Sequence, residues 1–297
     1  MRNKFFSRVL MLLIGLSLLK PLPADNTIAT PTLPINDVSI SNYFSLFTVP
    51  KSGSHLLIKI LYFMTGLAPQ WHIIPLDVES CFLEGKFPYT HMCLSNDLIN
   101  FYSNAPFIKQ IIGVRDLRDV CVASVYQILK GCWPEFANNQ NRLRKFKSLS
   151  FDKQLLWVIQ QEYELKPPIS LQLGMTEVAK QVQELIQNPN IFVCRYEDLV
   201  GDKGGGSQEK QYQTIQNLGE YLGIYLSSEQ IEEIAAHIYG NTITLFGDGE
   251  FANYQSTFRK GKIGTWKECF KECHKNAFKK RLGSALIALG YEENDEW

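Results

Sequence analysis

The sequence predicts an α/β fold in which a central, mostly parallel sheet is flanked by helices. Three apolar runs of strand length, Phe44–Val49, Lys109–Val114 and Ile191–Cys194, alternate with segments whose apolar residues recur at helical spacing. Strands that alternate with helices along a chain are typical of a parallel sheet covered on both faces. Ligands of such sheets bind beyond the carboxyl ends of the strands, and the first two strands each end in a charged turn.

Length and composition are those of a folded protein with a real core. The chain has 297 residues, of which 45% are hydrophobic and 12% aromatic, enough for one large domain or two small ones. Its 30 basic and 30 acidic side chains balance, so the net charge gives no reason to expect nucleic acid or an anionic membrane as partner. A bound anion would have to be held by a local cluster of residues.

The first 24 residues differ from the rest and predict a signal peptide or a short N-terminal anchor. MRNKFFSR carries three positive side chains, Val9–Leu19 is apolar or small throughout, and KPLPA follows at Lys20–Ala24. The apolar stretch is too short for a stable transmembrane span. Cleavage after Ala24 would send the protein into the secretory pathway or out of the cell, whereas a wrongly assigned start site would leave it cytoplasmic. Residues 38–292 are predicted to form a single domain.

Cysteine spacing predicts neither a disulfide framework nor a metal site. The seven cysteines are odd in number and irregularly spaced. Cys269, Cys273 and His274 form a group that resembles metal ligands, but no second ligand pair stands at zinc spacing. We therefore expect these three to be ordinary helix residues and no metal to be bound.

Helices are expected between the strands wherever apolar residues recur every three or four positions. The first begins at His55 and closes at Gly66–Trp71, and the stretch from there to Tyr89 lacks a strong period and is assigned to loops with one short strand. Ser227 and Gln230 have the spacing of a helix capping box. The other predicted helices are Val120–Leu129, Phe151–Leu165, Thr176–Ile186, Gln211–Leu222, Ser228–Tyr239 and Lys275–Leu289. Polar or irregular stretches predicted as loops are Asn138–Lys147, the flexible surface loop Gly201–Gln208 and Asn241–Lys262.

The turn after the first strand, PKSGS at Pro50–Ser54, has the residues of an anion site. Gly53 lacks a Cβ, which lets the backbone approach a ligand closely, and the following helix points its N–H groups and positive dipole end at the same place. Lys51 adds a full positive charge, and Ser52 and Ser54 add hydroxyl donors. An ordinary strand-to-helix turn explains these residues equally well when the turn is taken alone. The GK[ST] ending of a P-loop is absent, which argues against a magnesium-dependent kinase.

Four separated segments resemble, in order, the motifs of sulfotransferases that use 3'-phosphoadenosine 5'-phosphosulfate (PAPS) as donor. PKSGS is similar to the family's 5'-phosphosulfate loop, and IIGVRDLRDVCVAS, from Ile111, resembles its 3'-phosphate strand and helix. FVCRYEDL, from Phe192, and FRKGKIGTWKECF, from Phe258, resemble its YEDL and RKGxxGxWKxxF segments. The resemblance implies a three-layer, P-loop-NTPase-like domain that transfers a sulfuryl group from PAPS to a hydroxyl or amine acceptor. It also implies adenosine 3',5'-bisphosphate as product and no requirement for a metal.

Most of the donor site is implied by the same resemblance. Lys51 would bridge the transferred sulfuryl group and the 5'-phosphate as a catalytic residue. Arg115 would bind the 3'-phosphate, which a guanidinium fork suits better than an ammonium does, and Tyr196 would contact adenine. The remaining implied donor contacts are Ser52, Gly53, Ser54 and His55 at the 5'-phosphate, Ser124, Arg259, Lys260 and Gly261 at the 3'-phosphate, and, after an insertion, Thr244 and Phe246.

A catalytic base is implied as well, because the acceptor must lose a proton as it attacks. Histidine titrates near the working pH and is the natural base. The segment YTHMCLSN around His91 resembles the family's KTHLP segment and lies between the two phosphate-binding turns. A single histidine beside apolar residues is more often structural, and that alternative stays open.

The chain departs from the family pattern at several places, one of them Ser54 and His55, which stand where the family's loop usually has two threonines. The serine expected after Arg115 stands one position late, since Ala123 occupies its place and Ser124 follows, and one helical residue is a rotation of about 100°. Leu56 stands where many members have an adenine-stacking tryptophan. The segment between Lys51 and His91 is short, and acceptor loops usually lie there, so no preference for phenols or steroids carries over.

The acceptor that the resemblance implies is a small molecule, a carbohydrate or a protein that offers a hydroxyl or an amine. The signal-like N-terminus favours a carbohydrate, glycolipid or protein met outside the cytosol. The alternative is a catalytically inactive, sulfotransferase-like protein that binds an anionic ligand or a partner protein. Such a descendant is expected to lose Lys51 or His91, and both are present.

Overall fold

The computed structural model describes residues 43–72, 74–91, 96–131, 136, 139–160, 175–240 and 259–297. All of them belong to one compact unit. The signal-like residues 1–24 and the predicted donor contacts Thr244 and Phe246 lie outside the described residues.

The described residues form one sheet of five parallel strands in the order β2-β3-β1-β4-β5. The strands are β1 Phe44–Thr48, β2 Ala68–Trp71, β3 Lys86–His91, β4 Lys109–Val114 and β5 Ile191–Arg195. β1 is central, with Thr48 opposite His91 of β3 on one side and Gly113 of β4 on the other. Because the strands are parallel, all their carboxyl ends lie at one edge. The predicted α/β class is confirmed.

β2 lies where no strand was expected, in the residues assigned to the close of the first helix, and β3 lies at the end of the stretch expected to hold one short strand. β2 and β3 contain Pro69 and Pro88, and proline argues against a strand because it cannot donate to the ladder. β3 nevertheless pairs on both sides, with β2 and with β1. Its Phe87 and Tyr89 side chains are buried, so packing outweighs the missing donor.

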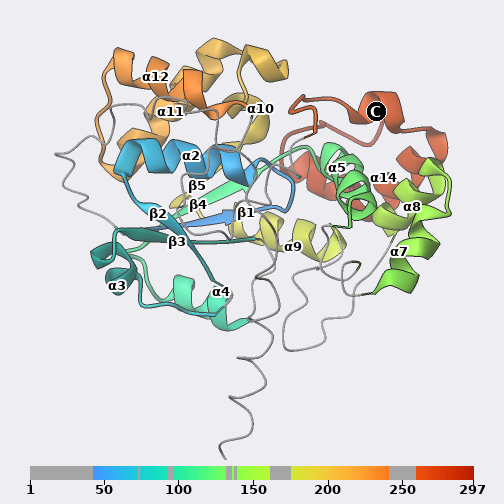
Figure 1. Cartoon of the computed structure of the whole chain (residues 1–297), viewed down its shortest axis with the longest axis horizontal. Helices are drawn as coiled ribbons and strands as arrows, with labels where there is room; N and C mark the ends of the chain where they lie inside the picture. Colours follow the sequence, from blue (N-terminus) through green and yellow to red (C-terminus); the bar gives the residue numbers. More distant parts are fainter. Residues whose placement is uncertain are drawn as a thin grey trace, which may run out of the picture. The chain divides into compact units, whose positions relative to one another are not determined.

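Helices cover both faces of the sheet, which makes the sheet the middle of three layers (Figure 1). Along β1, Phe44 and Leu46 join one apolar core and Phe47 joins the other. The helices are α2 Ser54–Thr65, α3 Val78–Leu83, α4 Asn96–Ser103, α5 Leu117–Leu129, α7 Gln140–Lys147, α8 Phe151–Gln160, α9 Met175–Leu185, α10 Tyr196–Leu199, the 3-10 helix η1 Asp202–Gly204, α11 Gln208–Leu222, α12 Ser228–Ile238, α13 Trp266–Cys269 and α14 Glu272–Ala288. The first core contains residues of α2, α11 and α12, and the second contains residues of α5, α8, α9 and α14.

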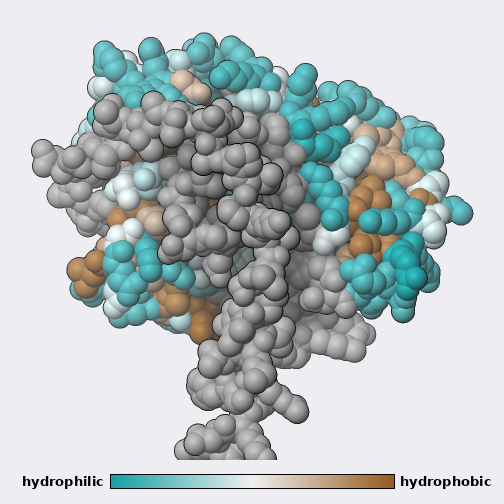
Figure 2. Space-filling model, in the orientation of Figure 1, coloured by the Kyte–Doolittle hydropathy of each residue, from teal (hydrophilic) through white to brown (hydrophobic). Residues whose placement is uncertain are grey.

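Helix boundaries follow local signals in several places. The predicted capping box of α12 is confirmed: Ser227 and Gln230 each bond the other's backbone N–H. The outer surface over α11 and α12 is mostly hydrophilic (Figure 2), as expected for helices that bury one face. The structure corrects the loop predicted at Asn138–Lys147, because α7 occupies most of it. Leu143 and Phe146 are buried there, three residues apart on one helical face.

The glycine-rich stretch Gly201–Gln208 is also a correction, since it is a folded turn and not a flexible surface loop. Gly204 is buried, and its carbonyl accepts a hydrogen bond from the Ile263 N–H at 3.0 Å. A Cβ on Gly204 would lie 2.1 Å from Val200 and 2.7 Å from the Gly261 carbonyl oxygen. Glycine here permits close packing against the C-terminal segment.

Three further properties of the described residues bear on function. None of their helices is long and apolar enough to cross a membrane. Nowhere in the described ranges do three or more His, Cys, Asp or Glu side chains group so as to hold a metal ion. Cys269 lies in α13 and Cys273 in α14, both as free thiols, while His274 accepts from the Lys271 N–H and bonds the Asp152 carbonyl.

Candidate functional site

Four residues predicted to act together are brought to the carboxyl edge of the sheet. Lys51 follows β1, His91 ends β3, Arg115 follows β4 and Tyr196 follows β5. These four strands are neighbours in the sheet, so their ends lie side by side (Figure 1). The edge of a parallel sheet thus gathers residues that are far apart in sequence.

The turn between β1 and α2 is strained and firmly held. Lys51 has a φ of 68°, the one positive value outside glycine among the described residues. Such strain persists only where the surroundings hold the backbone. The Ser52 hydroxyl does so by donating to the Gly113 carbonyl of β4 at 3.1 Å. At Gly53 φ is 89° and a Cβ would lie 2.4 Å from the Tyr196 ring, so glycine lets the tyrosine pack directly on the turn.

This turn leads into the N-terminus of α2, which suits an anion. The first N–H groups of a helix have no acceptor within the helix, and the helix dipole is positive at this end. The first turn of α2 carries no acidic side chain. Nearby, the Lys51 amine donates to Gln127 Oε1 of α5 at 3.2 Å, which brings its charge toward the second charged turn.

Arg115 is buried and held by several partners. Its Nη2 donates to Asp119 Oδ2 at 3.2 Å and to the Lys262 carbonyl at 2.8 Å. Its Nη1 donates to the Lys51 carbonyl at 3.4 Å, and the guanidinium lies 4.4 Å from the centre of the Tyr196 ring. The Nε is buried and has no hydrogen-bond partner within the described part of the chain. A buried unpaired donor costs about 1–3 kcal/mol, which an anion placed there would offset.

The segment 259–266 covers Arg115 from the C-terminal side. Tyr196 donates its hydroxyl to the Gly261 carbonyl at 2.7 Å. Arg259 donates to Thr265 Oγ1 at 3.2 Å and lies 4.4 Å from the ring centre of Tyr126. The Lys260 amine lies 3.5 Å from the exposed carboxylate of Glu268 on α13.

His91 is connected to the first turn by a chain of hydroxyl groups. Its Nδ1 lies 2.8 Å from Thr48 Oγ1, which in turn lies 2.8 Å from Ser54 Oγ. Burial, aided by the charge of Lys51, lowers the pKa of His91 to about 4. Burial and the neighbouring His91 and Lys51 lower the pKa of His55 to about 3. Both imidazoles are therefore neutral at pH 7, and a neutral imidazole can accept a proton.

Comparison with known proteins identifies the family. The model of the sulfotransferase domain matches residues 43–290 of this chain. The chain belongs to the sulfotransferase family. The crystal structure of mouse sulfotransferase SULT7A1 complexed with PAP superimposes with a TM-score of 0.57 and 16% sequence identity, over 86% of this chain and 90% of that one. This likeness confirms the predicted three-layer, P-loop-NTPase-like fold.

A relative among characterised sequences is the zebrafish (Danio rerio) protein Sulfotransferase 6B1. It is 28% identical over 91 residues, which make up 30% of this chain and 28% of the relative. The aligned part is thus under a third of that sulfotransferase's length. Sulfuryl transfer is the reaction of the family.

The sulfotransferase fold places some predicted residues differently from the family pattern. Ser124 is buried and donates its hydroxyl to the Val120 carbonyl within α5 at 2.8 Å, so the serine found one position late bonds its own helix. Three residues that contact the predicted site were not anticipated from the sequence: Thr48, Asp119 and Gln127. Asp119 had one usable signal, since it follows Arg115 by four residues, the spacing of a helical ion pair.

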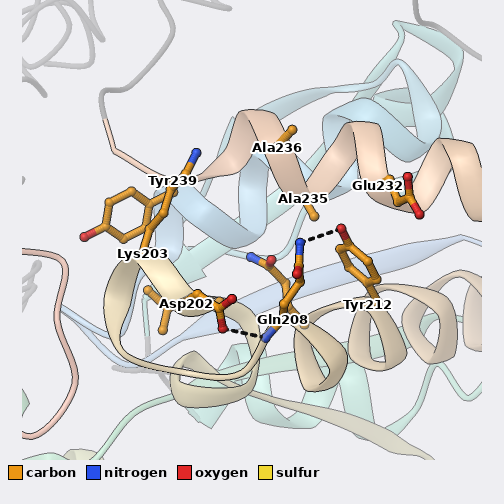
Figure 3. A pocket seen from close by; sticks show the side chains of 11 residues that line it. Asp202, Lys203, Gln208, Tyr212, Glu232, Ala235, Ala236 and Tyr239 are labelled. Carbon is orange, nitrogen blue, oxygen red and sulfur yellow. Dashed lines mark hydrogen bonds between the residues drawn. The ribbon is translucent and has the colours of Figure 1, made fainter.

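A separate cavity of about 260 Å³ lies between η1, α11 and α12 (Figure 3). Gln208 spans part of it, with its N–H donating to Asp202 Oδ1 at 3.0 Å and its side-chain amide to the Tyr212 hydroxyl at 2.8 Å. Tyr239, another lining residue, donates its hydroxyl to the Lys260 carbonyl at 3.1 Å. The predicted donor-binding residues that the structure describes do not line this cavity. The cavity is therefore distinct from the site at the strand ends, and it is linked to the segment 259–266 through Tyr239.

Proposed function

We propose that this sulfotransferase moves a sulfuryl group from PAPS to a hydroxyl or amine acceptor. The observation that carries the proposal is the meeting of two cationic turns at one sheet edge, one of them holding a buried Arg115 Nε without a partner among the described residues. Two anion sites suit a donor that carries a phosphosulfate at its 5' end and a phosphate at its 3' position. A ligand with a single phosphate would leave one turn unused.

The first turn would hold the 5'-phosphosulfate. Ser54 and His55 open α2, whose positive dipole end suits an anion and whose first turn carries no acidic side chain. Gly53 keeps the turn free of a Cβ and close to the Tyr196 ring. Lys51 adds the positive charge next to these groups, while the rigid hydrogen bonds of the turn keep it preorganised.

The second turn would hold the 3'-phosphate. Arg115 would bind it through Nε, and Arg259 and Lys260 add positive charge from the segment that covers Arg115. Guanidinium groups form strong charge-assisted hydrogen bonds with phosphate. The Tyr196 ring, stacked on Arg115, would contact the adenine from the side of the turn.

When bound, PAPS supplies an activated sulfuryl group and a phosphate as leaving group. As the bond from sulfur to the 5'-phosphate oxygen breaks and the bond to the acceptor forms, the acceptor proton passes to His91. If Nδ1–H donates to Thr48, the lone pair of Nε2 remains for this proton. Lys51 stabilises the charge that grows on the leaving oxygen. The negative donor would also raise the pKa of His91 from its low value, because an opposite charge favours imidazolium.

Calorimetric titration of the full chain with adenosine 3',5'-bisphosphate tests the donor site. We expect micromolar binding, and Arg115→Ala should weaken it at least tenfold, which is about 1.4 kcal/mol. Arg142→Ala is the matched control, since Arg142 belongs to α7 and its guanidinium lies over the rings of Phe136 and Trp157, away from the residues of the sheet edge. Absence of heat with well-folded protein would refute the proposal and favour an inactive descendant that binds another anion or a partner protein.

The acceptor and the compartment extend the same proposal. Because residues 1–24 resemble a secretory signal, we propose a carbohydrate, glycolipid or protein acceptor met outside the cytosol. Labelled PAPS offered with each acceptor class should label one of these in preference to soluble phenols. Protein recovered from secreting cells should begin at Asp25, and an intact Met1 would count against export.

A further inference from the structure

We propose that Asp119 is a positioning residue that joins Arg115 to the C-terminal segment 259–266 and thereby sets the affinity for a 3'-phosphate. The inference rests on the proposed PAPS site and deepens it. Asp119 lies one helical turn after Arg115 and has no exposed surface. It is therefore unable to reach solvent or a substrate, and it acts through its neighbours.

Both oxygens of the Asp119 carboxylate are fully used. Oδ1 accepts from the Thr265 hydroxyl and from the Trp266 N–H, each at 2.8 Å. Oδ2 accepts from the Gly264 N–H at 2.8 Å and from Arg115 Nη2 at 3.2 Å. Hydrogen bonds to an ionised acceptor are about twice as strong as neutral ones. Three of the four come from residues 264–266 and fix the C-terminal segment against α5, while the fourth holds Arg115.

The same carboxylate sets the direction of Arg115. A guanidinium is planar, so fixing Nη2 on Asp119 and on the Lys262 carbonyl fixes the direction of the unpaired Nε. Asp119 also reaches the second predicted phosphate ligand, because Thr265 accepts from Arg259 at 3.2 Å while donating to Asp119. One buried acid thus organises both guanidinium groups that are proposed to bind the 3'-phosphate.

A bare carboxylate next to a phosphate site would repel the ligand, and the structure offsets this repulsion. Two backbone N–H groups and a hydroxyl point at the Asp119 oxygens in addition to Arg115. These dipoles share the negative charge, so the arginine charge is not wholly cancelled by its partner. The arrangement predicts that Asp119 raises affinity for the 3'-phosphate even though its own charge has the wrong sign.

Asp119→Asn tests this role, because it keeps the shape of the side chain and replaces one acceptor oxygen with an NH2 donor. The readout is the preference for a 3'-phosphate, measured on the full chain as the ratio of the dissociation constants of adenosine 5'-monophosphate and adenosine 3',5'-bisphosphate. We expect the ratio to fall at least tenfold, with the affinity for the monophosphate changed less than threefold. The variant should add little to Arg115→Ala, since both act on the same guanidinium.

Two more variants separate positioning from general damage. Asp152→Asn removes the carboxylate partner of Lys271, a contact that involves neither Arg115 nor residues 259–266, and should leave the ratio unchanged. Thr265→Val removes one donor to Asp119 and the link to Arg259, and should lower the ratio by a smaller factor.

The outcomes distinguish the inference from the proposed function. Wild-type protein that binds neither nucleotide would refute the PAPS site itself. A wild-type preference for the 3'-phosphate that survives in folded Asp119→Asn would overturn the positioning role alone. If Asp119→Asn does not fold, Thr265→Val decides, and an unchanged ratio in that variant overturns the inference.

Discussion

Replacing Gly53 with alanine tests how closely Tyr196 packs on the first turn. The φ of 89° at this position costs an ordinary L-residue about 1–2 kcal/mol. The new methyl group would also lie 2.4 Å from Cδ2 and 2.8 Å from Cε2 of the tyrosine ring. Forcing a methyl group into packed side chains costs about 1–3 kcal/mol. The two effects together predict a loss of about 2–5 kcal/mol of unfolding free energy, a large share of the 5–15 kcal/mol typical of a folded protein.

Urea unfolding at pH 7 measures this loss, with Gly85→Ala as the matched control. Gly85 has a similar φ of 73°, but nothing lies within 4 Å of the position that its Cβ would take. That variant carries the backbone cost alone, so the difference between the two variants isolates the contact with Tyr196. Moving the ring would also disturb its stacking on Arg115, so Gly53→Ala should weaken nucleotide binding and Gly85→Ala should not.

Two results would refute this reasoning. The close contact would be wrong if Gly53→Ala were no less stable than Gly85→Ala. It would also be wrong if Tyr196→Ala, which removes the ring, failed to relieve the excess loss in the double variant.

Three further predictions concern buried polar groups. The pKa of His91 is about 4 in the folded protein and 6.5 in the unfolded chain, so the unfolded chain takes up a proton first and stability falls as the pH drops from about 6.5 toward 4. His91→Asn should therefore lose less unfolding free energy than wild type between pH 7 and pH 5, and an equal loss would contradict this. Burial lowers the pKa of Lys59 from 10.5 to about 8, so its charge destabilises the fold most below pH 8. In urea unfolding, the unfolding free energy of wild type should rise relative to that of Lys59→Met between pH 8 and pH 10. A difference between the two that does not change with pH would refute the shift. Thr48→Val removes the hydroxyl between His91 and Ser54, and should lower kcat at least tenfold with a smaller change in nucleotide affinity; an unchanged kcat would exclude an orienting role.

The central strands could be predicted because burial on both faces leaves a continuous apolar run, as in β1 and β4. The position of β3 could not, because Pro88 and the polar residues around it hide a strand whose place is fixed by pairing with β1 and β2. α7 was missed for a related reason. Its burial rests on two residues, Leu143 and Phe146, too few to give a clear period in a basic sequence.

The candidate site also has a part that the sequence predicts and a part that it does not. Arg115 and Tyr196 stand directly after a strand and Lys51 stands three residues after one, so their meeting follows from the parallel sheet once the strands are known. The bonds of Asp119 to residues 264–266 join points far apart in the chain, and no local pattern reveals them. The glycines of residues 201–208 predict a flexible loop from the sequence. In the fold, Gly204 instead allows a contact with Val200 and Gly261 that any side chain at this position would prevent.

The large sequence separation of the Asp119 hydrogen bonds also determines when, during synthesis, the proposed nucleotide site can form. Its bond to the Gly264 N–H closes a loop of 145 residues, and β5, the last strand that the structure describes, already ends at Arg195. A nascent chain can therefore complete these five strands well before residue 264 leaves the ribosome, but Arg115 is uncovered until then. Contacts of such separation form late because loop closure is entropically costly. A chain that stops before residue 264 also lacks the part of the second core that α14 supplies, so both the packing of the sheet and the cover of Arg115 depend on residues made last.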